Sequence, residues 1–139
     1  QVGGGALAAC LSQGLDHRVP LVAVQAEGAA PLSAALRRAA RFEHPERHWA
    51  DVMQPWPNPH SLADGILDDE TYDWLAVREA IDRSKGRAIV VSETSIAEAH
   101  VAAQAAGFDV SPTGSAGLAG ALTERPDVPL VVVMSGVAR

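Results

Sequence analysis

The stretch VGGGALAA, Val2 to Ala9, places three consecutive glycines between the end of an apolar pattern and a run of helix-forming residues. Glycines let the backbone approach a ligand closely, and the free N–H groups in the first turn of a helix attract an anion, above all a phosphate. We therefore predict a strand end, a glycine loop and a helix that closes at Gly14. This loop is the first candidate ligand site.

Short apolar runs alternate with helical patterns along the rest of the chain, which is typical of buried parallel strands connected by helices. The expected strands are 19–25, 87–92, 108–110 and 128–135, and the expected helices are 6–14, 31–42, 68–84, 95–107 and 114–122. Ser95 and Glu98 are expected to form a capping box. Residues 43–69 contain four prolines and little periodicity, so we expect a long loop with one helical turn at 61–65.

These patterns predict an α/β fold, a three-layer α/β/α sandwich with a mostly parallel sheet. The 139 residues are enough for one ordinary domain, and with 47% apolar but only 4% aromatic residues its core must consist largely of Ala, Val and Leu. The chain starts with Gln1 rather than Met, and its first residues have the pattern of a strand already begun. We therefore expect a segment of a longer protein.

Charge and cysteine content restrict the partners. The net charge is -6, and the basic residues are scattered apart from Arg37, Arg38 and Arg41, which we interpret as a solvated helix face. Nucleic acid is therefore not an expected partner. A single cysteine, Cys10, excludes an internal disulfide and suggests the cytoplasm. The chain has neither a run of about 18 apolar residues nor a signal-peptide pattern, so no membrane association is expected.

Two ligand chemistries use a glycine loop of this kind. In the first, a dinucleotide, Gly3, Gly5 and Ala8 satisfy G-x-G-x-x-G/A, and Glu27 follows the next strand where a ribose-binding acid would stand. In the second, a phosphate monoester such as pyridoxal phosphate, the N–H groups suffice and no ribose acid is needed. A tight turn that binds nothing is the third possibility.

The stretch SPTGSAGLAG, Ser111 to Gly120, favours the phosphate monoester. Pro112 fixes the backbone and Thr113 places a short hydroxyl at the mouth of a second helix. In a dinucleotide-binding fold, a hydroxyl at the start of a second helix has no assigned function. Helix capping by Thr113 or Ser115 alone would also explain it.

Five segments together, VGGGALAA, VAVQAEGAAPL, HSLADGI, SPTGSAGLAG and LVVVMSGVAR, resemble in order and spacing the C-terminal half of the fold type II (tryptophan synthase β-like) pyridoxal-phosphate enzymes. Within them the chain looks most like threonine synthase and the threonine or serine dehydratases. The resemblance covers essentially the whole chain, from Val2 to Arg139.

The resemblance implies roles for particular residues. The cofactor phosphate would be held by the glycine loop, namely Gly3, Gly4, Gly5, Ala6 and Leu7, with Ala6 in the place of a fourth glycine. Thr113 would meet the pyridine nitrogen, and Ser111 precedes the motif where many members have Glu. A neutral hydroxyl at that position is expected to leave the ring nitrogen largely unprotonated, which suits elimination and replacement at the β-carbon.

Such an enzyme also needs a lysine that carries the cofactor, and this chain has one lysine, Lys85, in the charged turn RSKGR. We interpret Lys85 as solvated, and by resemblance the cofactor lysine lies in an N-terminal half. We therefore expect about half of a site, with no catalytic residue and no turnover by residues 1–139 alone. We also expect a homodimer, or association with the missing portion.

The expected reaction is that of a lyase acting on an amino acid, threonine synthase first (phosphohomoserine to threonine) and threonine or serine dehydratase second. A dinucleotide-binding domain and a noncatalytic interaction module remain as alternatives.

The other candidate residues receive simpler interpretations. The histidines His44, His48 and His60, with Glu43 and Glu46, are interpreted as solvated loop residues rather than as a metal site, because Pro45 interrupts a helix there. The tryptophans Trp49, Trp56 and Trp74 are expected to anchor the proline-rich loop against a neighbouring domain or subunit. Cys10 is expected to be a small core residue.

Overall fold

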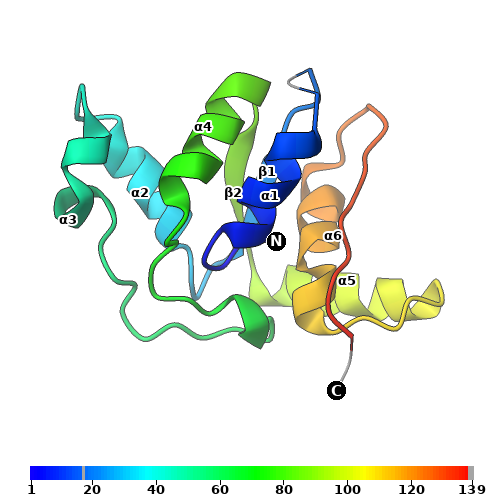
Figure 1. Ribbon diagram of the computed structural model, residues 1–139. Helices are drawn as coiled ribbons and strands as arrows, with labels where there is room; N and C mark the ends of the chain where they lie inside the picture. Colours follow the sequence, from blue (N-terminus) through cyan, green and yellow to red (C-terminus); the bar gives the residue numbers. More distant parts are fainter. Residues whose placement is uncertain (17, 138–139) are drawn as a thin grey trace.

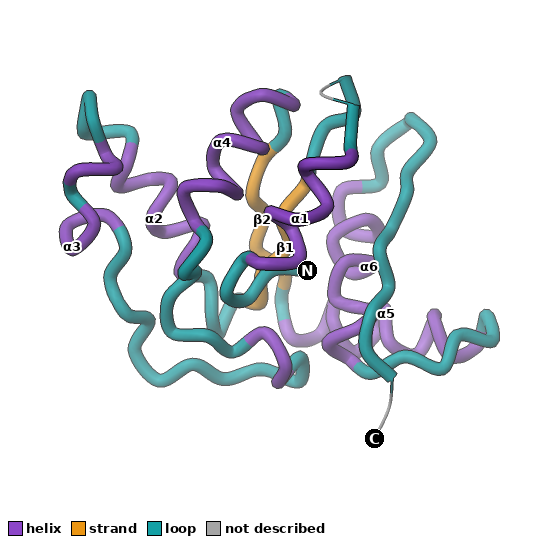
Figure 2. Tube along the Cα trace, in the orientation of Figure 1, coloured by secondary structure: helices purple, strands orange, loops and turns teal. Residues whose placement is uncertain are grey.

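A two-stranded parallel sheet with helices on both faces forms the centre of the molecule (Figure 1, Figure 2). The structure is a computed structural model, and it describes residues 1–16 and 18–137. Its elements are α1 (Ala6–Gly14), β1 (Val22–Ala26), α2 (Pro31–Ala39), η1 (Pro45–Arg47), α3 (Trp49–Val52), η2 (Asp64–Ile66), α4 (Trp74–Ser84), β2 (Arg87–Val91), α5 (Glu93–Ala105) and α6 (Pro112–Glu124). The prediction of an α/β fold with a parallel sheet is confirmed.

The side chains of the two strands alternate between two separate cores. Ala23 of β1 lies opposite Ala88 of β2, and both contribute to a core with α1, α2, α3 and α4. The next pair, Val24 and Ile89, packs on the other face, in a core with α5 and α6. Because successive side chains of a strand point to opposite faces, one apolar run serves both cores. The three layers are visible in Figure 1.

Gln25 is a fully buried polar side chain on β1. Its amide donates to the carbonyl of Val2 at 3.2 Å and accepts from the backbone N–H of Ser33 at 3.0 Å. The backbone N–H of Val2 in turn donates to the carbonyl of Val24 at 2.9 Å. Residues 1–3 therefore lie along the edge of β1, which agrees with the strand-like pattern of the first residues. Because both the N–H and the oxygen of the Gln25 amide are hydrogen-bonded, its burial costs little free energy and fixes residues 1–3 relative to β1.

The N-terminal caps of α5 and α6 differ from the caps predicted from the sequence. At α5 the N-cap is Ser92, whose hydroxyl accepts from Ser95 N at 3.1 Å, so the predicted capping box of Ser95 and Glu98 is wrong. At α6 the N-cap is Ser111, whose hydroxyl accepts from Gly114 N at 3.1 Å, so neither Thr113 nor Ser115 caps this helix. Both observed caps are serines in extended conformation directly before the helix, the favoured arrangement.

Two predicted strands, 108–110 and 128–135, do not form a sheet in the described part of the chain. Their composition suits strands, but a strand also requires a neighbour's backbone groups, and Val131 is 93% exposed. The second segment instead runs beside α6 (Figure 1), where Ser111 N donates to the carbonyl of Gly136 at 3.3 Å. The last two residues of the quoted motif, 138–139, lie outside the described residues.

The irregular segment 43–69 contains the predicted helical turn, as η2, and also η1 and α3. Trp74 is fully buried in the core of this domain, and Trp49 packs edge-on against it with ring centroids 5.9 Å apart. Trp74 therefore belongs to the core of its own domain, and for this residue the prediction of a contact with a neighbour is wrong. Trp49 is 40% exposed, and for Trp49 and Trp56 the contact with a neighbour stays a prediction. Cys10 is exposed, because it lies on the face of α1 opposite the buried Ala8 and Ser12, so the prediction that it is a core residue is wrong.

Within residues 1–16 and 18–137, no helix has the length and apolar character needed to cross a bilayer.

Gly120 of α6 packs directly on the sheet. A Cβ at this position would lie 2.6 Å from Val24 Cγ2 and 3.0 Å from Ile89 Cδ1. We expect Gly120→Ala to lower the free energy of unfolding by about 1–2 kcal/mol, because overpacking outweighs the better helix propensity of alanine. Urea unfolding followed by circular dichroism measures this.

The matched control is Gly14→Ala at the end of α1, where an added Cβ would meet nothing within 4 Å. This variant should raise the free energy of unfolding by up to about 1 kcal/mol. Equal effects of the two substitutions would contradict the packing of α6 on β1.

Candidate functional site

One pocket brings together the glycine loop and the start of α6. Its volume is about 330 Å³, within the range of about 300–1,000 Å³ that small-molecule sites occupy. It is lined by Gln1, Val2, Gly3, Gly4, Gly5, Ala6, Leu7, Ala8, Gly65, Ile66, Asp68, Thr113 and Ser135. Segments from opposite ends of the sequence thus share one concave surface.

The backbone of the glycine loop is oriented by its carbonyl groups, four of which in succession accept hydrogen bonds. They are Val2 O from Gln25 Nε2 (3.2 Å), Gly3 O from Thr71 Oγ1 (2.9 Å), Gly4 O from Asp73 N (2.9 Å) and Gly5 O from Ala9 N (2.9 Å). In a trans peptide the N–H of the next residue points opposite to the carbonyl. The N–H groups of residues 3–6 therefore point away from these partners, and the same residues line the pocket.

The same loop forms the N-terminus of α1. Gly5 is the N-cap residue with φ +102°, a conformation that L side chains rarely adopt, and no side chain caps this helix. The N–H groups of the first turn of a helix have no carbonyl partner within the helix and carry the positive end of its dipole. Loop and helix end together form a concave group of donors suited to an anion.

Thr113 lies in the first turn of α6 and faces the same pocket. Its hydroxyl oxygen accepts from Gly65 N at 2.9 Å, and its hydroxyl proton is directed at Asp64 Oδ1, 3.3 Å away. A Cβ on Gly65 would lie 3.1 Å from the Thr113 hydroxyl oxygen, so the close approach of η2 to α6 favours glycine there. Because Ser111 caps the helix, the Thr113 hydroxyl is not needed for capping.

The segment after η2 forms the wall next to the glycine loop. A Cβ on Gly3 would lie 2.5 Å from Asp68 Oδ2 and 3.0 Å from the Ile66 Cα, so only glycine fits at this position without movement. Asp68 places a carboxylate beside the N–H groups. The loop is thus packed tightly against this segment, and Asp68 also lines the pocket.

Tyr72 lies close to the glycine loop, with its ring 3.3 Å from the position of a Cβ on Gly4. Its hydroxyl donates to Asp69 Oδ1 at 3.2 Å. The negative charge of Asp69, together with this hydrogen bond, raises the pKa of Tyr72 above its ordinary value, with smaller contributions from desolvation, Asp68 and Glu70.

The structure brings all the cofactor-binding residues predicted from the sequence into this pocket, namely Gly3, Gly4, Gly5, Ala6, Leu7 and Thr113. Sequence reasoning gave no role to Asp64 and Thr71, which contact Thr113 and Gly3, or to Asp68, which lines the pocket. The first belongs to the quoted segment HSLADGI, whose place between two glycine-rich motifs was the only available signal.

Other candidates lie elsewhere. Lys85 is exposed and ends α4 just before β2. Glu27 accepts a hydrogen bond from Glu93 N at 3.0 Å, at the start of α5, and does not line the pocket. His44 pairs with Glu46 and His48 with Asp51. Within residues 1–16 and 18–137 no three His, Cys, Asp or Glu side chains are grouped so that they could hold a metal ion.

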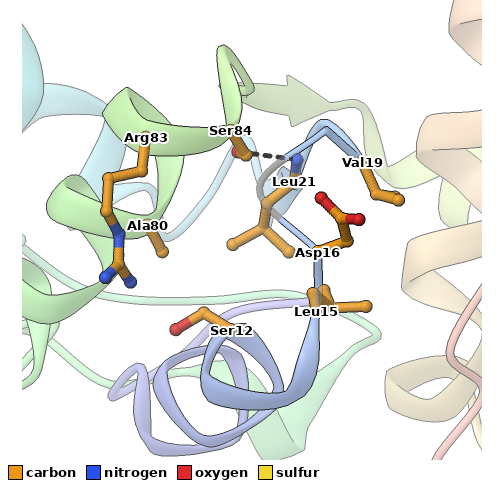
Figure 3. A pocket seen from close by; sticks show the side chains of 8 residues that line it. All are labelled: Ser12, Leu15, Asp16, Val19, Leu21, Ala80, Arg83 and Ser84. Carbon is orange, nitrogen blue, oxygen red and sulfur yellow. Dashed lines mark hydrogen bonds between the residues drawn. The ribbon is translucent and has the colours of Figure 1, made fainter.

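A second pocket, between α1 and α4, is shown in Figure 3. Ser12, Leu15, Leu21 and Arg83 are among its lining residues, and Ser84 accepts there from Leu21 N at 3.0 Å. Its volume of about 10 Å³ is no larger than one water molecule requires. It therefore carries no ligand hypothesis.

The sequence model of the family described as "Pyridoxal-phosphate dependent enzyme" matches residues 1–136. The chain belongs to this family of pyridoxal-phosphate-dependent enzymes. The predicted relationship and the predicted cofactor are thereby confirmed, and pyridoxal phosphate is favoured over a dinucleotide.

The chain is similar to one curated protein and to two proteins of known structure. A threonine synthase of Mycobacterium leprae (strain TN) is 30% identical over 113 residues, which are 80% of this chain and 26% of that protein. A threonine deaminase from T.th. superposes with a TM-score of 0.74 and 27% identity over 99% of this chain and 47% of its own. Maize serine racemase superposes with a TM-score of 0.67 and 23% identity over 88% and 35%, a likeness of fold. The chain thus spans less than half the length of each.

Thr71 is fully buried, and its hydroxyl holds the carbonyl of Gly3. We expect Thr71→Val to lower the free energy of unfolding by about 1–3 kcal/mol, because the carbonyl loses its donor in a buried place. Thermal and urea unfolding check this. Thr123→Val, which removes a hydroxyl bonded to Ala119 O within α6, is the matched control and should change stability by less. A larger loss in the control would contradict the role of Thr71.

Tyr72 is the only tyrosine in the sequence, so tyrosinate absorbance reports on it alone. Its raised pKa keeps the phenol protonated to higher pH than in a free tyrosine. We expect Asp69→Asn to shift the titration midpoint down, whereas Asp109→Asn, in the loop between α5 and α6, should leave it in place. Absorbance titration from about pH 8 to 12 measures both, and a midpoint unmoved by Asp69→Asn would be inconsistent with the Asp69 contact.

Proposed function

We propose that this pocket binds pyridoxal phosphate, with the phosphate at the glycine loop and the ring nitrogen at Thr113. The observation that carries the proposal is the convergence of the two helix starts, α1 and α6, on one pocket of about 330 Å³. A phosphate and a ring nitrogen at opposite ends of one flat molecule require two such contact points.

The loop fits a phosphate. In this proposal the N–H groups of residues 3–6, which point away from the partners of the neighbouring carbonyls, donate to the phosphate, and the N-terminal end of α1 adds its dipole. Absence of a Cβ at Gly3 and Gly4 lets Asp68, Ile66 and Tyr72 pack against the loop and hold its backbone in place. Asp68 is the one carboxylate that lines the described pocket, and its charge opposes the phosphate from the side of Gly3.

Thr113 and Ser135 are polar side chains that line the pocket beyond the loop. Thr113 is fixed by its contacts with η2 and does not need to reorient to meet a ring atom. When bound, pyridoxal phosphate supplies the electron-withdrawing ring that stabilises negative charge at the α-carbon of an amino acid. The contribution of this chain is to hold and orient it.

We propose that residues 1–139 supply only part of the catalytic site, as the C-terminal segment of the cofactor-binding domain, and that the lysine that carries the cofactor lies on another segment. Lys85, the only lysine of the chain, is exposed and does not line the pocket. The chain spans 26% to 47% of the relatives described above, which is consistent with this proposal. Association with the remaining portion, and a homodimer, are further parts of the hypothesis.

For the reaction we propose a lyase acting on an amino acid, threonine synthase-like, in which phosphohomoserine loses phosphate and gains water to give threonine. The similarity to the threonine synthase supports this choice. A threonine or serine dehydratase is the second candidate, and the similarity to the threonine deaminase supports it. Release of phosphate from phosphohomoserine by the native full-length protein would establish the first, and formation of an oxo acid and ammonia from threonine the second.

Gly3→Ala tests the phosphate site. The added Cβ displaces Asp68 or the loop itself, and we expect the affinity of the native full-length protein for pyridoxal phosphate to fall tenfold or more, about 1.4 kcal/mol. Equilibrium dialysis with detection of the cofactor by fluorescence measures the dissociation constant. Gly14→Ala, at the C-terminal end of α1, should leave the dissociation constant unchanged. Unaltered affinity in Gly3→Ala would exclude the loop as the phosphate site.

A further inference from the structure

Two carboxylates follow the strands at the carboxyl-terminal edge of the sheet. Ala26 of β1 and Val91 of β2 are register partners in the parallel pair, so Glu27 and Glu93 come after the same edge. Glu27 Oε1 accepts from Glu93 N at 3.0 Å, and Glu27 N donates to the carbonyl of Val91 at 2.9 Å. The first N–H groups of a helix have no partner within it, so Glu27 satisfies one of them at the start of α5.

The carboxylate of Glu93 connects α5 to a distant part of the chain. Its Oε2 accepts from the backbone N–H of Leu62 at 2.8 Å, 31 residues earlier in the sequence. Leu62 is 53% exposed, so its side chain anchors the backbone little, whereas a hydrogen bond to a carboxylate is among the stronger polar contacts. Glu93 lies in the first turn of α5, where the helix dipole favours a negative charge.

A second contact holds the same segment to the edge of the sheet. The backbone N–H of His60 donates to the carbonyl of Gly28 at 3.2 Å. A Cβ on Gly28 would collide with the carbonyl oxygen of His60, so the two backbones are closely packed. Residues 60–62 therefore lie against the loop after β1 and the start of α5.

The segment continues directly into a wall of the pocket. Gly65 and Ile66 of η2 line the pocket, and Gly65 N donates to Thr113 Oγ1 at 2.9 Å. Only two residues separate Leu62 from Gly65, which leaves the chain little slack between the two hydrogen bonds. A displacement of Leu62 would therefore move the wall of the pocket.

We propose that Glu93 is a positioning residue for the cofactor pocket, which holds η2 in place through the backbone of Leu62. Glu27 supports this role because it binds the backbone of Glu93. The inference rests on the proposed function, in which this pocket binds pyridoxal phosphate. Glu93 is not among the described residues that line the pocket, so it acts on the ligand through η2 alone.

The two oxygens of the Glu93 carboxylate have different surroundings. Oε2 accepts from Leu62 N, whereas Oε1 is buried and has no hydrogen-bond partner among the described residues. A buried acceptor without a donor costs free energy. Glu93→Gln keeps one oxygen that can accept from Leu62 N and removes the charge. This substitution therefore separates the hydrogen bond from the effect of a charge at the start of α5.

The test combines two measurements on the native full-length protein. Hydrogen exchange followed by mass spectrometry, without cofactor, reports on the order of residues 60–66. We expect Glu93→Leu to speed exchange there by about tenfold, because a hydrogen bond to a charged group is lost. Equilibrium dialysis should show a dissociation constant for pyridoxal phosphate that is raised about fivefold, because η2 no longer holds its position.

Three further variants make the result specific. Glu93→Gln should restore both the slow exchange and the affinity. Glu98→Leu, at an exposed position of the same helix, should change neither. Glu93→Asp keeps the charge but shortens the side chain, so it should behave like Glu93→Leu and replaces it if Glu93→Leu does not fold.

Each outcome decides between statements. Faster exchange at residues 60–66 with weaker binding, both restored by Glu93→Gln, supports the inference. Unchanged exchange, or unchanged affinity despite faster exchange, overturns it and leaves the proposed cofactor site standing. Equal losses in Glu93→Gln and Glu93→Leu also overturn it, because the charge and not the contact with Leu62 would then matter. Wild-type protein that does not bind pyridoxal phosphate overturns the proposed function, and the inference with it.

Discussion

The hydrogen bonds that hold the carbonyl groups of residues 2–5 determine how the glycine loop faces its surroundings. The donors come from separate parts of the chain: β1 through Gln25, the segment before α4 through Thr71 and Asp73, and α1 itself through Ala9. A carbonyl held on one side turns the following N–H to the other side. The anion binding that we propose for the loop therefore depends on donors that lie outside the loop's pocket face.

The second constraint is the close approach of η2 to the start of α6. Gly65 allows its backbone to reach Thr113, and Ser111 satisfies the end of the helix so that Thr113 remains available. Both contacts involve backbone groups, which have few degrees of freedom once the helices are packed. A polar side chain on α6 is thus fixed in position by a segment far earlier in the sequence.

The two hydrophobic cores fix the positions of the glycine loop and of η2. The α1, α2 and α4 side of the sheet holds the glycine loop through Val2 and Ala8, and the α5 and α6 side holds η2 through Ala63 and Ile66. One parallel pair of strands separates them. The pocket lies where elements of both cores meet, outside the packed interior.

Much of the fold and of the site could be predicted from local patterns. The limits of α1 matched the expected ones and β2 was close, because apolar periodicity and glycines mark such elements directly. The helix expected at 68–84 ends where expected but begins at Trp74, so its start was predicted six residues too early. The glycine loop and Thr113 were recognised because small residues and a fixed hydroxyl at helix starts are local features. The caps at Ser92 and Ser111 were missed, since several hydroxyl residues stand near each helix start and local sequence does not rank them.

The amino-acid sequence by itself determined the α/β class, the family and the candidate cofactor loop, because each is carried by residues adjacent in the chain. Only the tertiary structure decided which groups from distant parts of the chain come into contact. The approach of Asp64 to Thr113, of Asp68 to Gly3 and of Thr71 to the loop carbonyl depends on packing between distant segments. It likewise decided that the apolar run at 128–135 is not a strand here, since strand formation depends on a neighbouring backbone as well as on composition.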